Sequence, residues 1–293
     1  MKSTLSLVFA AFICSTAFAQ TVNHKMVSDD PSDMRKLQVA VDAFMTAGFS
    51  LEDNDNDGYL AFGYQIRAAY YPIMNRIGVE FEYQKGSDIG SGLDVSKTEL
   101  RGSFALISAS SKKTRVLTID QSVRANYTVN TNIRVPQTVQ NNLEGRFSLL
   151  RNKGFAGQVD FGAAGTGFAL YNTTAVGLGL QWRSYRAYEA LIDNAYYIKS
   201  SGHFQLYGDV LFGMGTSWGD PNSNSATDPT EAEIEAALDA ENIRSNVGGR
   251  IGFKATTRTT KTLAFSGGAE VGFLPPNSAL HSLIYFGMTL NFL

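Results

Sequence analysis

Apolar and polar side chains alternate along most of the chain, and this period of two residues limits the fold more than any other feature of the sequence. In residues 59–70, Leu60, Phe62 and Ile66 fall on one face of an extended segment, whereas Gln65 and Arg67 fall on the other. Successive side chains of a β-strand point to opposite faces, so this segment is predicted to be a strand with one apolar and one polar side.

The same alternation returns in twelve segments. They are residues 39–51, 59–70, 77–84, 99–106, 117–127, 143–149, 155–161, 176–183, 204–214, 246–254, 263–273 and 284–292. Segments of about ten residues can cross the hydrocarbon core of a membrane when they are tilted. The sequence therefore predicts an all-β, transmembrane, antiparallel up-and-down β-barrel of about twelve strands, with ten or fourteen strands as alternatives.

A soluble β-sandwich also alternates with a period of two, so it is the competing interpretation. Three observations favour the barrel: charged residues lie in the middle of the polar face in most segments, short and long connections alternate, and the last strand has a distinctive ending. The mean hydropathy of -0.11 agrees with a transmembrane barrel, because only every second residue of such a strand faces lipid.

The first residues have the layout of a secretory signal peptide. Lys2 is followed by an apolar stretch and then by the small residues Ala17 and Ala19 around Phe18. We expect residues 1–19 to be the signal peptide, 20–37 to be a periplasmic N-terminal arm and 38–293 to form the barrel. Cys14 lies in the signal peptide, so the exported chain is expected to contain no disulfide.

The connections predict an orientation for the barrel. The segments 72–76, 110–114, 151–153 and 257–261 read as tight periplasmic turns, whereas 52–57, 86–97, 128–141 and 219–242 read as longer outside loops. The segment 186–202 is too long for a tight turn. The spacing of Tyr188, Leu191, Ile192 and Ala195 predicts a short amphipathic helix there, and an extra hairpin is the alternative.

The last strand carries a pattern known from one group of proteins. Tyr285, Gly287, Leu290 and Phe292 resemble the C-terminal signal by which Gram-negative outer-membrane β-barrels are delivered to the barrel-assembly machinery. The resemblance implies an integral protein of the cell outer membrane, with outer-membrane lipid and the assembly machinery as partners. It implies an architecture and no particular activity. Partners in an oligomer or complex stay open.

The polar faces supply the candidate functional residues, because charges inside a barrel need water or partners. The predicted lumen-lining residues are Arg67, Glu80, Glu82, Glu99, Arg101, Asp120, Arg124, Glu144, Arg146, Asp160, Arg183, Asp209, Arg250, Lys254 and Glu270. One hypothesis is a narrow porin-like channel for small hydrophilic solutes or ions. The other is a salt-bridged, non-conducting barrel that serves as an anchor or as a subunit of an envelope complex.

Other candidate sites are weaker. Asp53, Asp55 and Asp57 resemble the start of a calcium loop, but the glutamate that would complete it is missing, so an acidic turn is favoured over weak divalent-ion binding. The exported chain has three histidines, and none has a serine partner evident from spacing, so we expect no enzymatic activity; a lipid-modifying enzyme is a minor alternative. A net charge of -2 argues against nucleic-acid binding, and no motif indicates a cofactor. Residues 229–241, which are rich in carboxylates, predict a helix in the longest loop, either a solvated surface helix or a lid or partner-binding segment at the barrel mouth.

Overall fold

The computed structural model describes eleven β-strands and one α-helix, within residues 24–28, 36–49, 59–73, 76–124, 127–160, 166–192, 196–219, 230–240, 245–258, 263–276 and 280–292. The strands are β1 (His24–Ser28), β2 (Leu37–Phe49), β3 (Tyr59–Ile73), β4 (Ile77–Asp88), β5 (Asp94–Arg124), β6 (Tyr127–Asp160), β7 (Thr166–Ile192), β8 (Tyr196–Trp218), β9 (Val247–Arg258), β10 (Leu263–Phe273) and β11 (Leu280–Phe292). The helix α2 spans Glu231–Ala240, within the segment predicted to be helical. None of the helical residues described forms a helix long and apolar enough to cross a membrane.

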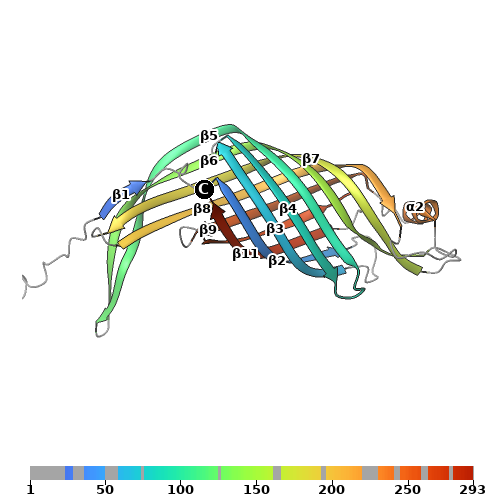
Figure 1. The fold of residues 1–293 in the computed structure, drawn as a ribbon, viewed down its shortest axis with the longest axis horizontal. Coiled ribbons are helices and arrows are strands. Elements are labelled where there is room, and N and C mark those ends of the chain that lie inside the picture. Colours follow the sequence, from blue (N-terminus) through green and yellow to red (C-terminus); the bar gives the residue numbers. More distant parts are fainter. Residues whose placement is uncertain are drawn as a thin grey trace, which may run out of the picture.

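Strands β2 to β11 form a closed ring in which each strand pairs antiparallel with its neighbours in the chain (Figure 1). The ring closes where β2 pairs with β11, from Leu37 opposite Phe292 to Phe49 opposite Leu280. The prediction of an antiparallel up-and-down barrel is confirmed. The barrel has ten strands, which is one of the two alternatives to the expected twelve.

The number of strands is lower because β5 and β6 are unusually long. The predicted turns 110–114 and 151–153 and the predicted loop 128–141 lie inside these two strands. The described residues of the segments 117–127 and 155–161 belong to the same two strands. The prediction of breaks there was wrong. Residues 110–114 pair with β6 beyond the end of β4, whereas residues 151–153 pair with both β5 and β7 inside the ring, so strand pairing keeps these polar segments extended. The predicted outside loop 86–97 is likewise shorter, since only residues 89–93 separate β4 from β5.

The described residues of the segment 186–202 form no helix, so the prediction of one was wrong for them. Residues up to Ile192 continue β7, and residues from Tyr196 begin β8, with Ile192 paired to Tyr196 across the turn. Tyr188 and Leu191 lie in a strand, so their helical spacing reflects no helix. The alternative of an extra hairpin is closer to the structure, although the hairpin extends two barrel strands and adds none to the ring.

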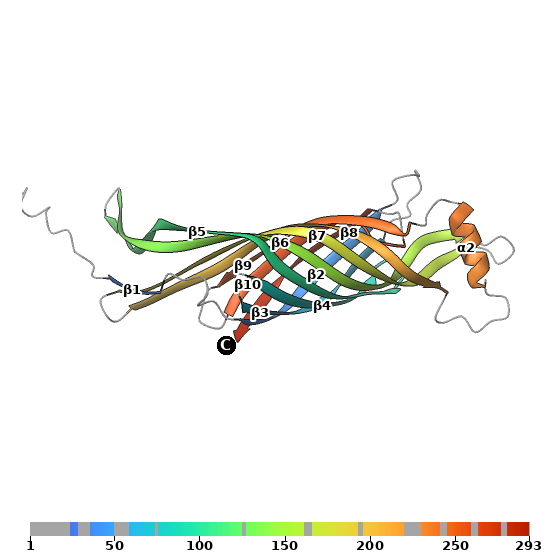
Figure 2. The same ribbon diagram turned by 90° about the horizontal axis from the view of Figure 1, so that it is seen from above.

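The two ends of the barrel differ. We call the end where β2 begins and β11 finishes the terminal end, and the opposite end, which carries α2, the loop end (Figure 2). At the terminal end β5 and β6 continue well beyond the last pair between β4 and β5, Ile77 with Phe104. The short strand β1 pairs there with the end of β7, from His24 opposite Ile192 to Ser28 opposite Glu189. The terminal end therefore carries a sheet extension outside the ring.

A small apolar cluster holds this extension together. Ile133 and Val135 of β6 are buried against Tyr188 of β7, with Leu117 and Ile119 of β5 packed beside them. The β5–β6 hairpin thus curves back over the end of β7, as its path beyond the ring in Figure 1 indicates. Apolar burial of this kind fixes the hairpin where no ring neighbour supports it.

The outer surface of the ring is apolar and the inside is polar. Large apolar side chains such as Phe104, Phe147, Leu178, Ile251 and Phe286 are exposed on the outside, and Phe286 is 72% exposed. A water-facing protein rarely exposes a continuous apolar surface of this size, whereas a barrel surrounded by lipid does. The outer surface is therefore suited to a membrane.

Candidate functional site: an ion-pair network inside the barrel

The interior of the ring holds a dense group of buried charged side chains, which we call the interior network. Among the described side chains it contains seven cations and seven carboxylates. They are Arg67, Lys97, Arg101, Arg146, Arg183, Arg250 and Lys254, and Asp42, Glu80, Glu82, Glu99, Glu144, Asp209 and Glu270. All lie on the inward positions of strands β2 to β10, since the period of two places every second residue there.

Several ion pairs cross the full width of the barrel. Lys254 Nζ of β9 lies 3.3 Å from Glu80 Oε2 of β4. The Nη1 of Arg250, also on β9, donates to Glu99 Oε2 of β5 at 2.9 Å. Lys97 Nζ of β5 lies 3.3 Å from Glu270 Oε1 of β10. In the ring order, β4 lies opposite β9 and β5 lies opposite β10, so these contacts join opposite walls.

Arg250 is a centre of this network. Besides Glu99, its Nε donates to Asp209 Oδ2 at 2.9 Å, and its Nη1 lies 3.3 Å from Glu270 Oε2. The side chain of Arg250 is 0% exposed, and that of Glu99 is also 0% exposed. Charges removed from water to this degree are tolerated only when they are paired and hydrogen-bonded, which is the arrangement seen here.

Glu80 is a second centre, nearer the terminal end. Its carboxylate accepts hydrogen bonds from Tyr71 Oη at 2.8 Å and from Arg183 Nη2 at 3.1 Å, in addition to its contact with Lys254. Arg101 reaches the same carboxylate at 3.5 Å and also binds Glu82. Side chains from four other strands therefore contact the buried carboxylate of Glu80.

Tyrosine rings fill the space between the guanidinium groups. The Arg146 guanidinium lies 4.0 Å from the centre of the Tyr207 ring, and the Arg183 guanidinium lies 4.8 Å from that of Tyr71. Near the seam between β2 and β11, Arg67 donates to Asp42 at 2.7 Å and lies 4.6 Å from the ring centre of Tyr285. Stacking on rings stabilises cations that have lost their water. At the level of the network, side chains occupy the lumen.

Most of the predicted lumen-lining residues lie in this interior. Asp120 does not: it is exposed on the part of β5 that lies outside the ring, because two bulges and the long extension separate it from the barrel. The side chains of Arg124 and Asp160 lie outside the described residues. The sequence reasoning missed Asp42 and Lys97. Lys97 lies two residues before the inward-facing Glu99, and Asp42 lies four residues after the inward-facing Gln38. An even spacing places residues of a strand on the same face, so the alternation could have identified both as inward-facing.

Of the assembly-signal residues, Tyr285 is buried on the inner face, Leu290 is exposed on the outer face, and Gly287 pairs with Asp42 across the seam. Nothing is described of the Phe292 side chain. The candidate calcium residues Asp53, Asp55 and Asp57 lie outside the described residues as well. Among residues that are described, no group of histidine, cysteine or carboxylate side chains could hold a metal ion.

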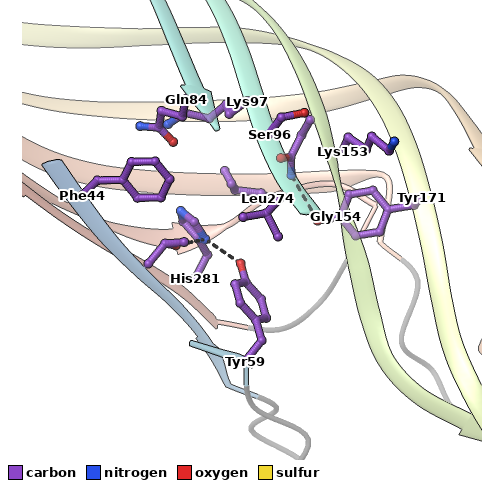
Figure 3. Close-up of a pocket in the computed structure, with 13 residues that line it drawn as sticks. Phe44, Tyr59, Gln84, Ser96, Lys97, Lys153, Gly154, Tyr171, Leu274 and His281 are labelled. Carbon is purple, nitrogen blue, oxygen red and sulfur yellow. Dashed lines mark hydrogen bonds between the residues drawn. The ribbon is translucent and has the colours of Figure 1, made fainter. Parts of the chain in front are cut away.

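A small cavity lies at the loop-end side of the network (Figure 3). Its volume is about 20 Å³, and Tyr59, Lys97 and His281 are among the residues that line it. His281 Nδ1 is 3.2 Å from Tyr59 Oη and 3.3 Å from Thr46 Oγ1. This volume holds about one water molecule. Within the described part of the chain no serine hydroxyl is hydrogen-bonded to His281 or His203, so neither has the nucleophile–base contact of a serine hydrolase.

The chain is similar in fold to several solved outer-membrane β-barrels. Neisserial surface protein A is 11% identical, with a TM-score of 0.34 over 88% of this chain and 97% of that one. The translocator domain of the autotransporter NalP from Neisseria meningitidis is 8% identical, with a TM-score of 0.33 over 99% of this chain and 98% of that one. The NanC porin is 8% identical, with a TM-score of 0.29 over 86% of this chain and 100% of that one.

No protein-family model matches the chain, and no curated protein matches its sequence. The solved structures share so little identity with this chain, at such low TM-scores, that they carry no argument about its activity. Function is therefore argued from the interior network and the outer surface.

Proposed function

We propose that the protein is an integral outer-membrane barrel that does not conduct, and that it anchors the sheet extension of its terminal end at the membrane. The ion pairs that join opposite walls carry this proposal, above all Arg250 with Glu99 and Lys97 with Glu270. A lumen crossed by side chains at hydrogen-bonding distance has no room for a continuous column of water at that level.

Two observations support the membrane location. The ring exposes apolar side chains on its outside, and the last strand resembles the outer-membrane assembly signal. We expect the purified protein to need detergent, to show β-type circular dichroism, and to migrate faster on gels when unheated than when boiled. A protein that stays folded and monodisperse in water without detergent would contradict the membrane location.

Conductance in a planar lipid bilayer tests whether the lumen is closed. We expect no steady openings from the native protein. In the double variant Glu99→Ala/Arg250→Ala, which keeps the net charge and removes a contact across the lumen, we expect stepwise conductance. A matched control is Lys85→Ala/Asp94→Ala, which removes an exposed ion pair of 3.7 Å between β4 and β5 and should stay silent.

The narrow channel predicted from the sequence is the alternative function. The charged and polar character of the interior supports it, because water could hydrate these groups if the network rearranged. Steady openings from the native barrel would favour the channel and overturn the closed barrel. In that case the acidic residues of α2, including Glu233 and Glu235, predict a mild cation preference at low salt.

A further inference from the structure

A second cavity, of about 340 Å³, lies at the terminal end, away from the interior network. It is formed where the β5–β6 extension approaches the ends of β7, β8 and β9. Its lining residues are Arg115, Gln137, Ser184, Arg186, Gly202, His203, Phe204, Ala255, Thr256 and Thr257. The volume is that of a small ligand site and is much larger than a single water molecule.

Buried polar side chains belong to the lining of this cavity. Ser184 of β7 is 2% exposed, and Gln137 of β6 is 7% exposed. The His203 ring points to the other side of the wall, into the barrel, where it lies 6.1 Å from the ring of Tyr185, because neighbouring residues of a strand face opposite sides. A ligand in the cavity therefore meets the polar groups of Ser184 and Gln137 and not the His203 ring.

Two guanidinium groups contribute positive charge to the cavity. Arg115 and Arg186 are both exposed, and neither forms an ion pair with a described side chain, in contrast to the arginines of the interior network. Arg115, which lies on the extension, is held against β7, since its guanidinium lies 5.7 Å from the centre of the Tyr188 ring. Paired arginines bind phosphate oxygens through charge-assisted hydrogen bonds.

The other side of the cavity continues into the apolar outer surface. Phe204 contacts Trp182 edge to face, with ring centres 5.9 Å apart, and stacks on Phe253 at 6.3 Å. Trp182 and Phe253 are exposed on the outside of the ring. A ligand in the cavity can therefore place an anionic group at the arginines and an apolar part along these rings.

We propose that this cavity binds a phosphate-bearing anion, and that its apolar flank selects the headgroup of an anionic phospholipid over free phosphate. The lipid source rests on the membrane location proposed above, whereas the phosphate chemistry rests on the cavity alone. Arg115 and Arg186 bind the phosphate oxygens, and the acyl chains lie beside Phe204.

Phosphorus NMR on the full barrel in a non-ionic detergent tests the proposal. The probes are short-chain phosphatidylglycerol, short-chain phosphatidylcholine and inorganic phosphate. We expect saturable binding, tightest for phosphatidylglycerol, to weaken about tenfold in Arg115→Gln and in Arg186→Gln, since a charged hydrogen bond contributes about that factor. Arg151→Gln is the matched control, because this exposed arginine contacts Asn172 of β7 and does not line the cavity.

Each outcome decides the proposal. Inorganic phosphate binding as tightly as phosphatidylglycerol, with the same loss in both variants, would retain the anion site and reject its lipid source. No saturable binding of any probe, or equal binding by the Arg115→Gln/Arg186→Gln double variant and the native barrel, would overturn the site. Heat-dependent gel migration of the same samples reports the barrel separately, so a failure of the membrane proposal is recognised on its own.

Discussion

Replacing Arg250 by methionine tests whether the barrel interior is dry or hydrated at the level of the network. Arg250 contacts Glu99, Asp209 and Glu270 from a position with no exposed side-chain surface. Arg250→Met keeps the length of the side chain and removes its charge, so the three carboxylates lose a shared partner. We expect the free energy of unfolding to fall substantially.

The magnitude follows from the degree of burial. Removing one partner of a buried ion pair costs about 3 to 5 kcal/mol, because the other charge is left without water and without its partner. The remaining contacts place Arg250→Met at the lower end of that range. Asp209 keeps Arg146 at 3.1 Å, and Glu270 keeps Lys97 at 3.3 Å and Tyr207 at 2.7 Å.

Urea unfolding of the refolded barrel in detergent micelles, followed by tryptophan fluorescence, measures this loss. The control is Arg151→Met, which removes an exposed guanidinium and should cost less than about 1 kcal/mol. A double-mutant cycle with Glu99→Gln isolates the contact between the two side chains. We expect the double variant to lose less than the sum of the single variants, by about 0.5 to 3 kcal/mol.

A loss of less than about 1 kcal/mol in Arg250→Met would refute the reasoning. Exposed ion pairs contribute only about 0 to 1 kcal/mol, so such a result would show that water replaces the missing partner. The interior would then be hydrated at the level of the network, and the channel would become the better interpretation.

Three further predictions concern the seam, the loop end and assembly. A Cβ atom at Gly287 would overlap the carbonyl oxygen of Val41 on β2, so Gly287→Ala should abolish the fast-migrating unheated band on gels. A Cβ atom at Gly102 would meet no atom within 4 Å, so Gly102→Ala should retain the band. The N-terminus of α2 is capped by Thr230, whose backbone and side chain donate to Glu233 at 2.7 and 2.8 Å and lower the pKa of that carboxyl. Stabilisation by this contact is therefore complete above the usual carboxyl pKa of 4.5 and is lost as the pH falls through the lower folded value. Glu233→Ala, which removes the titrating carboxylate, should speed proteolysis of the loop at neutral pH and have little effect in acid. Phe292→Ala should reduce the amount of folded barrel in the outer membrane, measured by fractionation, and normal levels would show that the C-terminal resemblance is misleading.

The barrel could be predicted from the sequence because its alternation is local. A few residues are enough to show that Glu99 and Arg101 lie on the polar face of a strand, and that Phe62 and Ile66 lie on the apolar face of another. The length of β5 could not be predicted in this way. Its segment around Lys112 and Lys113 has the polar composition of a turn, and its pairing with β6, which is distant in the sequence, keeps it extended.

The partners inside the network were beyond prediction for a different reason. Which carboxylate meets Arg250 depends on the number of strands and on the register around the closed ring. With twelve strands, β5 would not face β9 and β10 as it does here. The alternation of residues indicates that Glu99 and Arg250 face inward. Their contact at 2.9 Å depends in addition on the closure of the ring with ten strands.

The contacts between opposite walls have a consequence for cooperativity. Within the ring, every hydrogen-bonded strand pair except that between β2 and β11 joins strands that follow one another in the chain, so an open sheet could form those pairs step by step. Lys254 with Glu80 and Lys97 with Glu270 cannot form in an open sheet, because they need the far wall. Any opening of the seam therefore breaks ion pairs distant from it, and this coupling makes closure of the ring an all-or-none event.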